Sequence, residues 1–193
     1  MQSLENGRWL NEPTKAEASN TDLWVTTDAN TDFWRETHYG FVRDSGHFYA
    51  FQAKRDFTAQ VRIQAQFKHL YDQAGLMVRL NERRWVKTGI EFSDGYGLLS
   101  SVLTNETSDW ATGRYDSDPS DFWIRVTVQS GVLRIQASYD GRTWPLVRLC
   151  PFPEADHYLV GPMCCTPERA GLEVRFSEWR LGRALGKELH DLS

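Results

Sequence analysis

Short segments in which hydrophobic and polar residues alternate recur along the chain. Within residues 123–128, Ile124, Val126 and Val128 share one face, while more polar side chains occupy the other. Residues 132–138 repeat the pattern, with an apolar side chain at every second position. Because side chains alternate across a β-strand, a period of two predicts strands at both places.

Turn signals separate these segments. Residues that tolerate the positive φ of tight turns occur at 44–46, 81–84, 93–95, 129–131 and 140–141. Short strands at this spacing predict an all-β fold, an antiparallel sandwich of two sheets. Helical periodicity is limited to residues 184–192. We therefore expect one sandwich over residues 1–183 and a tail at 184–193 in which a short helix is one option.

Composition narrows the class of protein. The chain has 193 residues, and 13% of them are aromatic, which is typical of a packed fold rather than of a disordered chain. No apolar run approaches the roughly 20 residues of a membrane helix, and the first residues lack the pattern of a signal peptide. We expect no membrane partner and a cytoplasmic location. The net charge of −4 argues against a nucleic-acid partner.

The three cysteines and the other reactive residues form no recognisable motif. Cys150, Cys164 and Cys165 are odd in number, and the two adjacent ones point to opposite faces of a strand and do not pair. The sequence has no zinc-site spacing, no nucleophile elbow and no phosphate loop. We therefore expect free thiols in a reducing setting, no metal and no cofactor.

The segment 85–92 places polar groups on one face of a predicted strand. Trp85, Lys87, Gly89 and Glu91 alternate with positions that face the core. Alternate residues lie about 6.6 Å apart, so Lys87 and Glu91 are about 13 Å apart, too far for an ion pair, with a gap at Gly89. An aromatic side chain, a cation and a carboxylate on one surface could together bind a ligand with a polar ring. The alternative is a solvent-facing strand whose charges pair with neighbouring strands.

Two further stretches combine polar and aromatic residues beside predicted strands. Asp72 and Gln73 precede one predicted strand, and Asp109 and Trp110 follow another. Each Asp has an alternative role, because Asp in a loop commonly accepts hydrogen bonds from its own backbone. The aromatic residues of 31–35 are interpreted instead as part of the core.

These blocks resemble one protein family. The resemblance covers residues 5–181 and rests on Trp9 with Glu12-Pro13, residues 31–35, 71–76, 85–91, 108–110 and 138–141, and Gly161-Pro162. The chain is similar to the regulation-of-enolase family, which has many members of unassigned function and a concanavalin A-like jelly-roll sandwich. The blocks Asp-Gln-Ala-Gly-Leu and Trp-Val-Lys-x-Gly-Ile-Glu are the specific pair.

The resemblance implies both the fold and the place of a site. The wider jelly-roll group includes lectins, glucanases and accessory domains of xylosidases, so it implies a sugar-binding face, although fold alone does not fix function. The family's polar blocks fall on seven residues of this chain. We predict that these seven line one concave cleft: Asp72, Gln73, Trp85, Lys87, Glu91, Asp109 and Trp110.

Three functions follow as expectations. A retaining glucanase needs two carboxylates about 5–5.5 Å apart, and the segment 91–94 lacks the usual strand dyad, although Glu91 could combine with Asp72 or Asp109. We therefore assign no catalytic residue and expect a non-catalytic module that binds a saccharide or another small polar ligand. The alternative is a cytosolic protein-interaction or metabolic regulatory protein with a metabolic enzyme as its partner. A glycoside hydrolase ranks third.

Overall fold

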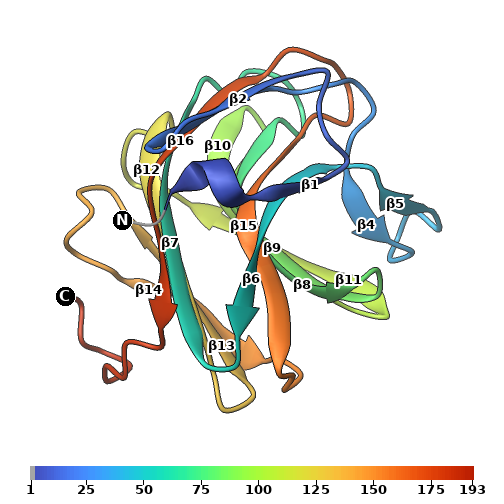
Figure 1. Cartoon of the computed structure of the whole chain (residues 1–193). Helices are drawn as coiled ribbons and strands as arrows, with labels where there is room; N and C mark the ends of the chain where they lie inside the picture. Colours follow the sequence, from blue (N-terminus) through green and yellow to red (C-terminus); the bar gives the residue numbers. More distant parts are fainter. Residues whose placement is uncertain (1–2) are drawn as a thin grey trace.

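Two seven-stranded antiparallel sheets face each other across one hydrophobic core (Figure 1). The computed structural model describes residues 3–193. In sheet A the strands lie in the order β1 (Arg8–Leu10), β6 (His47–Lys54), β15 (His157–Cys165), β8 (Gln73–Asn81), β9 (Arg84–Ser93), β10 (Tyr96–Asn105) and β11 (Thr107–Arg114). In sheet B the order is β14 (Leu146–Pro151), β13 (Val132–Ser138), β12 (Asp121–Gln129), β7 (Phe57–Ala65), β16 (Glu173–Arg183), β3 (Asp22–Thr26) and β2 (Lys15–Ala18). The expected two-sheet jelly-roll sandwich is confirmed.

Two small elements complete the fold. A single 3-10 turn, η1 (Leu4–Asn6), precedes β1. The strands β4 (Phe33–Arg35) and β5 (Val42–Asp44) pair only with each other and form a hairpin outside the two sheets.

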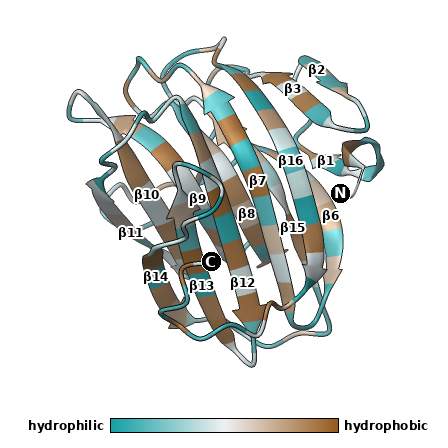
Figure 2. Cartoon of the chain, turned by 90° about the vertical axis from the view of Figure 1, so that its left-hand side faces the viewer, coloured by the Kyte–Doolittle hydropathy of each residue, from teal (hydrophilic) through white to brown (hydrophobic). Residues whose placement is uncertain are grey.

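Alternation of side chains explains why the two sheets stack. In β12, Ile124, Val126 and Val128 point into the core, as predicted. Figure 2 shows the same alternation of hydrophobic and hydrophilic bands along the strands of sheet B. On sheet A, Val86 and Ile90 of β9 face the core, so the alternate residues Lys87, Gly89 and Glu91 lie on the outer face, which is turned away from sheet B. This register decides where polar side chains can gather.

The predicted turns at 81–84, 93–95, 129–131 and 140–141 each connect paired strands. The predicted turn at 44–46 joins β5 to β6, but these two strands do not pair with each other, because β5 pairs with β4. The reason is that residues 31–46 leave the sandwich and fold back over the outer face of sheet A, where hydrophobic residues of both form a second, smaller core.

Two ion pairs fasten this hairpin to sheet A. The Nζ atom of Lys87 on β9 lies 2.7 Å from Oδ1 of Asp32, just before β4. The guanidinium of Arg79 on β8 binds both carboxylate oxygens of Asp44 at the end of β5, at 2.6 and 2.8 Å. A bidentate pair of this kind fixes orientation as well as distance. The open end of the hairpin, where β4 begins and β5 ends, is therefore held against the sheet.

The tail at residues 184–193 contains turns and no helix. It lies across the outer face of sheet B (Figure 2), where Arg125 and Arg134 donate hydrogen bonds to its backbone carbonyls. Leu185 and Leu192, which belong to the apolar stripe of the expected helix, are exposed. The short helix does not form. Arginine side chains bind carbonyl groups of the tail, and the apolar stripe would not be stabilised by burial.

The state of the three cysteines and the lack of a long apolar helix in the described residues agree with what the sequence predicts. Cys150, Cys164 and Cys165 are free and buried. Cys164 lies in the core between the sheets and Cys165 in the smaller core under the hairpin, so adjacent cysteines do point to opposite faces. Within residues 3–193, no helix has the length and the apolar content to cross a membrane.

A buried carboxylate holds the loop before β8. Asp72 is fully buried, accepts hydrogen bonds from the backbone N–H groups of Lys68 and His69 at 3.0 and 3.1 Å, and binds the guanidinium of Arg169. Burial by itself raises the pKa of Asp72, but the bonds from Arg169 and the two N–H groups outweigh it and hold the pKa below its ordinary value. Asp72 thus joins this loop to the connection between β15 and β16.

Replacing this carboxylate is expected to destabilise the fold in a pH-dependent way. Asp72→Asn should lower the free energy of unfolding by about 3 kcal/mol at neutral pH, because it removes one partner of a buried pair. Since the pKa of Asp72 is lowered in the folded state, its contribution is present above the unfolded pKa of about 4 and is lost as the pH falls through the folded pKa. Urea denaturation of both proteins at neutral and at strongly acidic pH measures the difference.

The matched control is Asp109→Asn. This substitution removes the ion pair of Asp109 with Arg148, and the side chain of Asp109 is 67% exposed. Exposed pairs contribute less than about 1 kcal/mol. Equal losses in the two variants, or a difference that persists at acidic pH, would contradict the role given to Asp72.

Candidate functional site

A hollow of about 160 Å³ lies between the β4–β5 hairpin and the outer face of sheet A. We call it the outer pocket. Aromatic residues form much of its lining: Trp34, Tyr39, Phe41, Tyr71 and Trp110. The polar lining residues are Asp32, Gln73, Lys87, Glu91 and Glu168, and the remaining two are Val102 and Pro167. Residues from the hairpin, from four strands of sheet A and from two loops therefore meet at one place.

The pair between Lys87 and Asp32 forms the buried end of the outer pocket. Lys87 is 4% exposed. Burial by itself lowers the pKa of Lys87, but Asp32, Cys165 and Glu91 act in the opposite direction, and the pKa lies above its ordinary value. Lys87 therefore stays protonated at neutral pH, and its charge is balanced by Asp32 at 2.7 Å.

A second carboxylate orients one wall of the pocket. Glu91 is 5% exposed and accepts a hydrogen bond from Oγ of Ser100 at 2.7 Å. The indole N–H of Trp110 donates to the same Oγ at 3.2 Å. Burial raises the pKa of Glu91, although Lys87 and Ser100 oppose the rise. The relay from Glu91 through Ser100 to Trp110 fixes the position of the indole.

Four aromatic rings of the pocket form a closed circuit, which we call the aromatic box. Trp34 meets Trp110 with ring centroids 6.3 Å apart and an angle of 89° between the planes. Trp110 meets Tyr71 at 6.4 Å and 72°, and Trp34 meets Tyr39 at 5.6 Å and 74°. The hydroxyl oxygens of Tyr39 and Tyr71 lie 3.1 Å apart and close the circuit. Edge-to-face contacts of this kind are the favoured aromatic geometry.

Tyr71 reaches the aromatic box through a left-handed backbone. Its φ of +62° is unusual for a bulky residue, and its N–H group donates to the carbonyl of Phe92 at 2.7 Å. The hydrogen bond with Tyr39, burial and the negative charges of Glu91 and Glu168 raise the pKa of Tyr71 to about 12. Strained conformations persist where the surroundings hold them, and they cluster at functional sites.

Four of the seven predicted residues line the outer pocket: Gln73, Lys87, Glu91 and Trp110. Lys87 and Glu91 lie on the same face of β9, as the alternation predicted. The structure therefore brings together residues from three of the sequence blocks.

The other three predicted residues lie elsewhere. Trp85 shares the outer face but is 1% exposed, because Phe33 of the hairpin covers it with ring centroids 6.0 Å apart, so the expected aromatic wall at this position is wrong. Asp72 is engaged in the loop before β8. Asp109 lies within β11 rather than in a turn and pairs with Arg148 at 3.1 Å, outside the outer pocket.

The gap attributed to Gly89 is filled by backbone. Gly89 pairs with Gly75 on β8, and a Cβ atom on Gly89 would lie 2.0 Å from the carbonyl oxygen of Ala74. Glycine at this position allows two strands to approach closely and leaves no space for a ligand.

Sequence reasoning missed the pocket residues of the hairpin and of the flanking loops: Asp32, Trp34, Tyr39, Phe41, Tyr71, Pro167 and Glu168. The interpretation of segment 31–35 as core holds for Phe33 and Trp34, although Trp34 also lines the pocket. The available signal was the composition of this segment, because an Asp beside aromatic residues also marks the block at 108–110. Its position over sheet A depends on long-range pairing that no local pattern shows.

The carboxylates of the pocket do not form a metal centre. In the part of the chain that the structure describes, no three His, Cys, Asp or Glu side chains are grouped so that they could hold a metal ion. Asp32 is engaged by Lys87 and Glu91 by Ser100. The pocket instead offers aromatic faces and hydrogen-bond acceptors.

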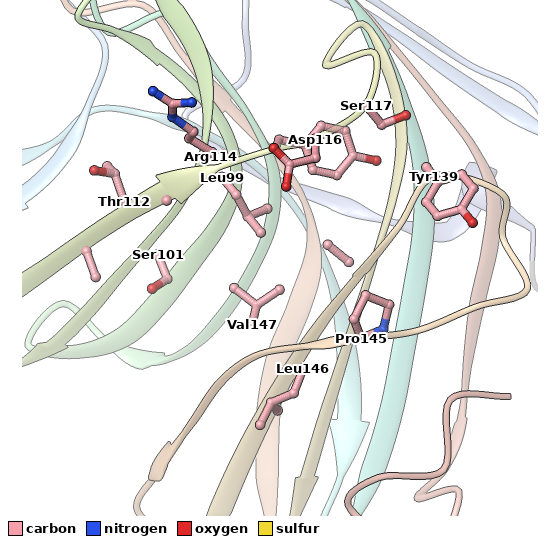
Figure 3. Close-up of a pocket in the computed structure, with 14 residues that line it drawn as sticks. Leu99, Ser101, Thr112, Arg114, Asp116, Ser117, Tyr139, Pro145, Leu146 and Val147 are labelled. Atoms are coloured by element: carbon pink, nitrogen blue, oxygen red, sulfur yellow. The ribbon is translucent and has the colours of Figure 1, made fainter.

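A second hollow of about 460 Å³ opens at the edge of the sandwich, between β10–β11 and β13–β14 (Figure 3). Leu99, Val147 and Pro145 contribute apolar surface, and its charged lining residues, Arg114 and Asp116, are exposed. None of the seven predicted residues lines it. The outer pocket brings aromatic side chains, a buried ion pair and a buried carboxyl group together in a smaller volume, and it is the stronger candidate site.

Solved structures place the fold among known proteins. A crystal structure of a functionally unknown protein from Saccharomyces cerevisiae has a TM-score of 0.94 and 58% identity, and the match covers 96% of this chain and 100% of that chain. The GH43 protein BlXynB from Bacillus licheniformis has a TM-score of 0.68 at 11% identity, with 94% of this chain and 39% of that chain covered. The second likeness concerns the fold alone.

Sequence comparison shows the family. "Regulation of enolase protein 1" of Saccharomyces cerevisiae is 60% identical over 190 residues, which are 98% of this chain and 96% of that protein. The model of the family described as "Protein of unknown function (DUF1349)" matches residues 9–184. The chain belongs to this DUF1349 family.

Proposed function

We propose that the protein is a non-catalytic binding protein whose outer pocket takes a small polar ligand. The observation that supports this most is the meeting of the aromatic box with the ion pair of Lys87 and Asp32 and the buried carboxyl group of Glu91 in one hollow. Small-molecule sites are typically apolar hollows in which a few polar groups fix the orientation of the ligand. Burial of charged groups costs free energy, so their presence at a hollow favours a function.

The size of the pocket limits the ligand. At about 160 Å³, it is smaller than the roughly 300–1,000 Å³ of sites that enclose drug-sized molecules. A ligand of about the size of one sugar ring fits this space. The likeness in fold to the GH43 protein from Bacillus licheniformis is a reason to include saccharides among the ligands tested.

Hydrolysis receives less support from the geometry. The carboxylate pairs that a glycosidase could have used, Glu91 with Asp72 or with Asp109, are not assembled, because Asp72 binds Arg169 and Asp109 lies outside the outer pocket. Asp32 and Glu168 are the carboxylates that join Glu91 in the lining; Asp32 is occupied by Lys87, and Glu168 is exposed. A binding role therefore uses more of the observed arrangement than a hydrolytic one.

A ligand of the outer pocket is expected to raise the Tm of the protein, and Trp110→Ala should abolish the shift, because the indole is a wall of the pocket. The measurement is a thermal-shift series with neutral monosaccharides, small carboxylates and small ammonium compounds at millimolar concentration. Trp24→Ala, which removes an exposed indole on sheet B, is the control and should keep the shift. If no compound class shifts the wild type, or if the shift survives in Trp110→Ala, the pocket is not the binding site.

A second candidate is a regulatory protein that binds a metabolic enzyme. It is favoured by the 60% identity to the yeast protein named for regulation of enolase. A protein partner would contact an area far larger than the outer pocket, since stable interfaces bury roughly 1,200–2,000 Å². Loss of one pocket residue should therefore leave such an interaction largely intact.

This second candidate predicts a direct complex with purified enolase. Biolayer interferometry should detect binding at micromolar enolase, and Trp110→Ala should bind as tightly as the wild type. Serum albumin serves as the non-specific control. No signal above that of albumin would remove enolase as a direct partner, and a signal lost in Trp110→Ala would place the interaction at the pocket.

A further inference from the structure

We propose that the ligand of the outer pocket is a small organic cation that carries a methylated or otherwise substituted ammonium group. The proposal rests on the proposed function, because it names the ligand class of the same pocket. Three features support it: the arrangement of the aromatic box, the use of the pocket's hydrogen-bond donors, and the charge of the lining.

The four residues of the aromatic box line the outer pocket, and neighbouring rings stand at steep angles to one another. Trp34 stands at 89° to Trp110, and Trp110 stands at 72° to Tyr71. An ammonium group is attracted to an aromatic face within about 6 Å of the ring centroid, most strongly for Trp. A flat sugar ring stacks on a single face, whereas a compact cation can contact several walls at once. The perpendicular walls therefore fit a cation better.

Phe41 lies outside this box. Its ring stacks on Tyr39 at 5.2 Å and 18°, and the guanidinium of Arg43 lies 4.7 Å from the centroid of Phe41. Phe41 thus packs against the ring of Tyr39, and the guanidinium of Arg43 already lies over the ring of Phe41. The proposed cation site therefore consists of the four rings of the aromatic box.

Both indole donors of the pocket, and part of its amide and hydroxyl donors, are already used within the protein. The indole N–H of Trp34 donates to the carbonyl of Thr37 at 3.0 Å, and that of Trp110 donates to Ser100 at 3.2 Å. The side-chain amide of Gln73 donates to a backbone carbonyl at 3.3 Å, and one of the two tyrosine hydroxyls donates to the other. A neutral polyhydroxy ligand needs donors as well as acceptors. A substituted ammonium group needs only aromatic faces and negative charge.

The charge of the lining also favours a cation. Lys87 is the one cationic side chain among the described lining residues, and Asp32 balances it at 2.7 Å. Glu168, which is exposed, then remains as a carboxylate with no cationic lining residue left to balance it. Aromatic faces add negative potential of their own. A pocket lined in this way attracts cations and disfavours anions.

The test compares a cation with a neutral molecule of the same shape. The full chain is titrated with choline chloride and with 3,3-dimethylbutanol, in which a carbon replaces the charged nitrogen, by isothermal titration calorimetry and tryptophan fluorescence. Glucose and xylose are titrated in parallel, and sodium chloride controls for ionic strength. We expect choline to bind at least about tenfold more tightly than its neutral isostere, because cation–π attraction acts on the charge.

Two pairs of variants assign the effect to the pocket. Trp110→Leu keeps apolar bulk but removes the aromatic face, and should weaken choline binding by about tenfold, whereas Trp110→Phe should lose less. Glu168→Gln removes an exposed carboxylate and should weaken choline binding by about threefold without changing the isostere. Glu173→Gln removes an exposed carboxylate of β16 outside the outer pocket and should change neither. An unchanged Tm shows that each variant is folded.

Each alternative result has a distinct meaning. Equal binding of choline and 3,3-dimethylbutanol overturns cation recognition. Binding of a saccharide that depends on Trp110, with no binding of choline, overturns this inference but leaves the proposed function in place. Choline binding that Trp110→Leu does not weaken overturns the assignment to the aromatic box. If none of these compounds binds, the proposed cation site is overturned, and the compound panel described for the proposed function decides whether the pocket binds anything else.

Discussion

The outer pocket depends on the buried ion pair between Lys87 and Asp32. An unpaired ammonium at a position that is 4% exposed would cost several kcal/mol, so the outer face of sheet A needs a counter-charge. Asp32 supplies it from 55 positions earlier in the chain, and the pair of Arg79 with Asp44 repeats the arrangement on the second strand of the hairpin, at the same open end. The two pairs hold the hairpin over the sheet, and the pocket is the space that remains beneath it.

Local pattern was sufficient to predict the sandwich and two of the twelve residues that line the outer pocket, Lys87 and Glu91. The period of two in β9 places Lys87 and Glu91 on one face whatever the rest of the chain does, and the same period in β12 defines the core. Turn residues at 93–95 and 129–131 mark hairpins because Asp, Ser and Gly there adopt positive φ. These features depend on neighbours in sequence, which is why the sequence reveals them.

The remaining features depend on contacts between distant residues. Trp85 was expected to be exposed because its neighbours are charged, yet Phe33 buries it from a hairpin about 50 positions away. Tyr39 and Tyr71 reach the aromatic box through irregular loops, and no periodicity indicates where a loop will direct its side chain. The family blocks pointed to the correct region, but only geometry separates the residues that line the pocket from those that hold its frame.

Native-state hydrogen exchange of the hairpin tests most directly whether the Lys87–Asp32 pair holds the pocket together. The measurement compares amides of residues 33–46 with those of β7 in the wild type and in Asp32→Asn. Because the pair is broken both when the hairpin opens and when the protein unfolds, we expect the variant to lower protection of both groups by a similar factor, about a hundredfold. Hairpin amides that keep their wild-type protection while those of β7 lose theirs would contradict this role of the ion pair.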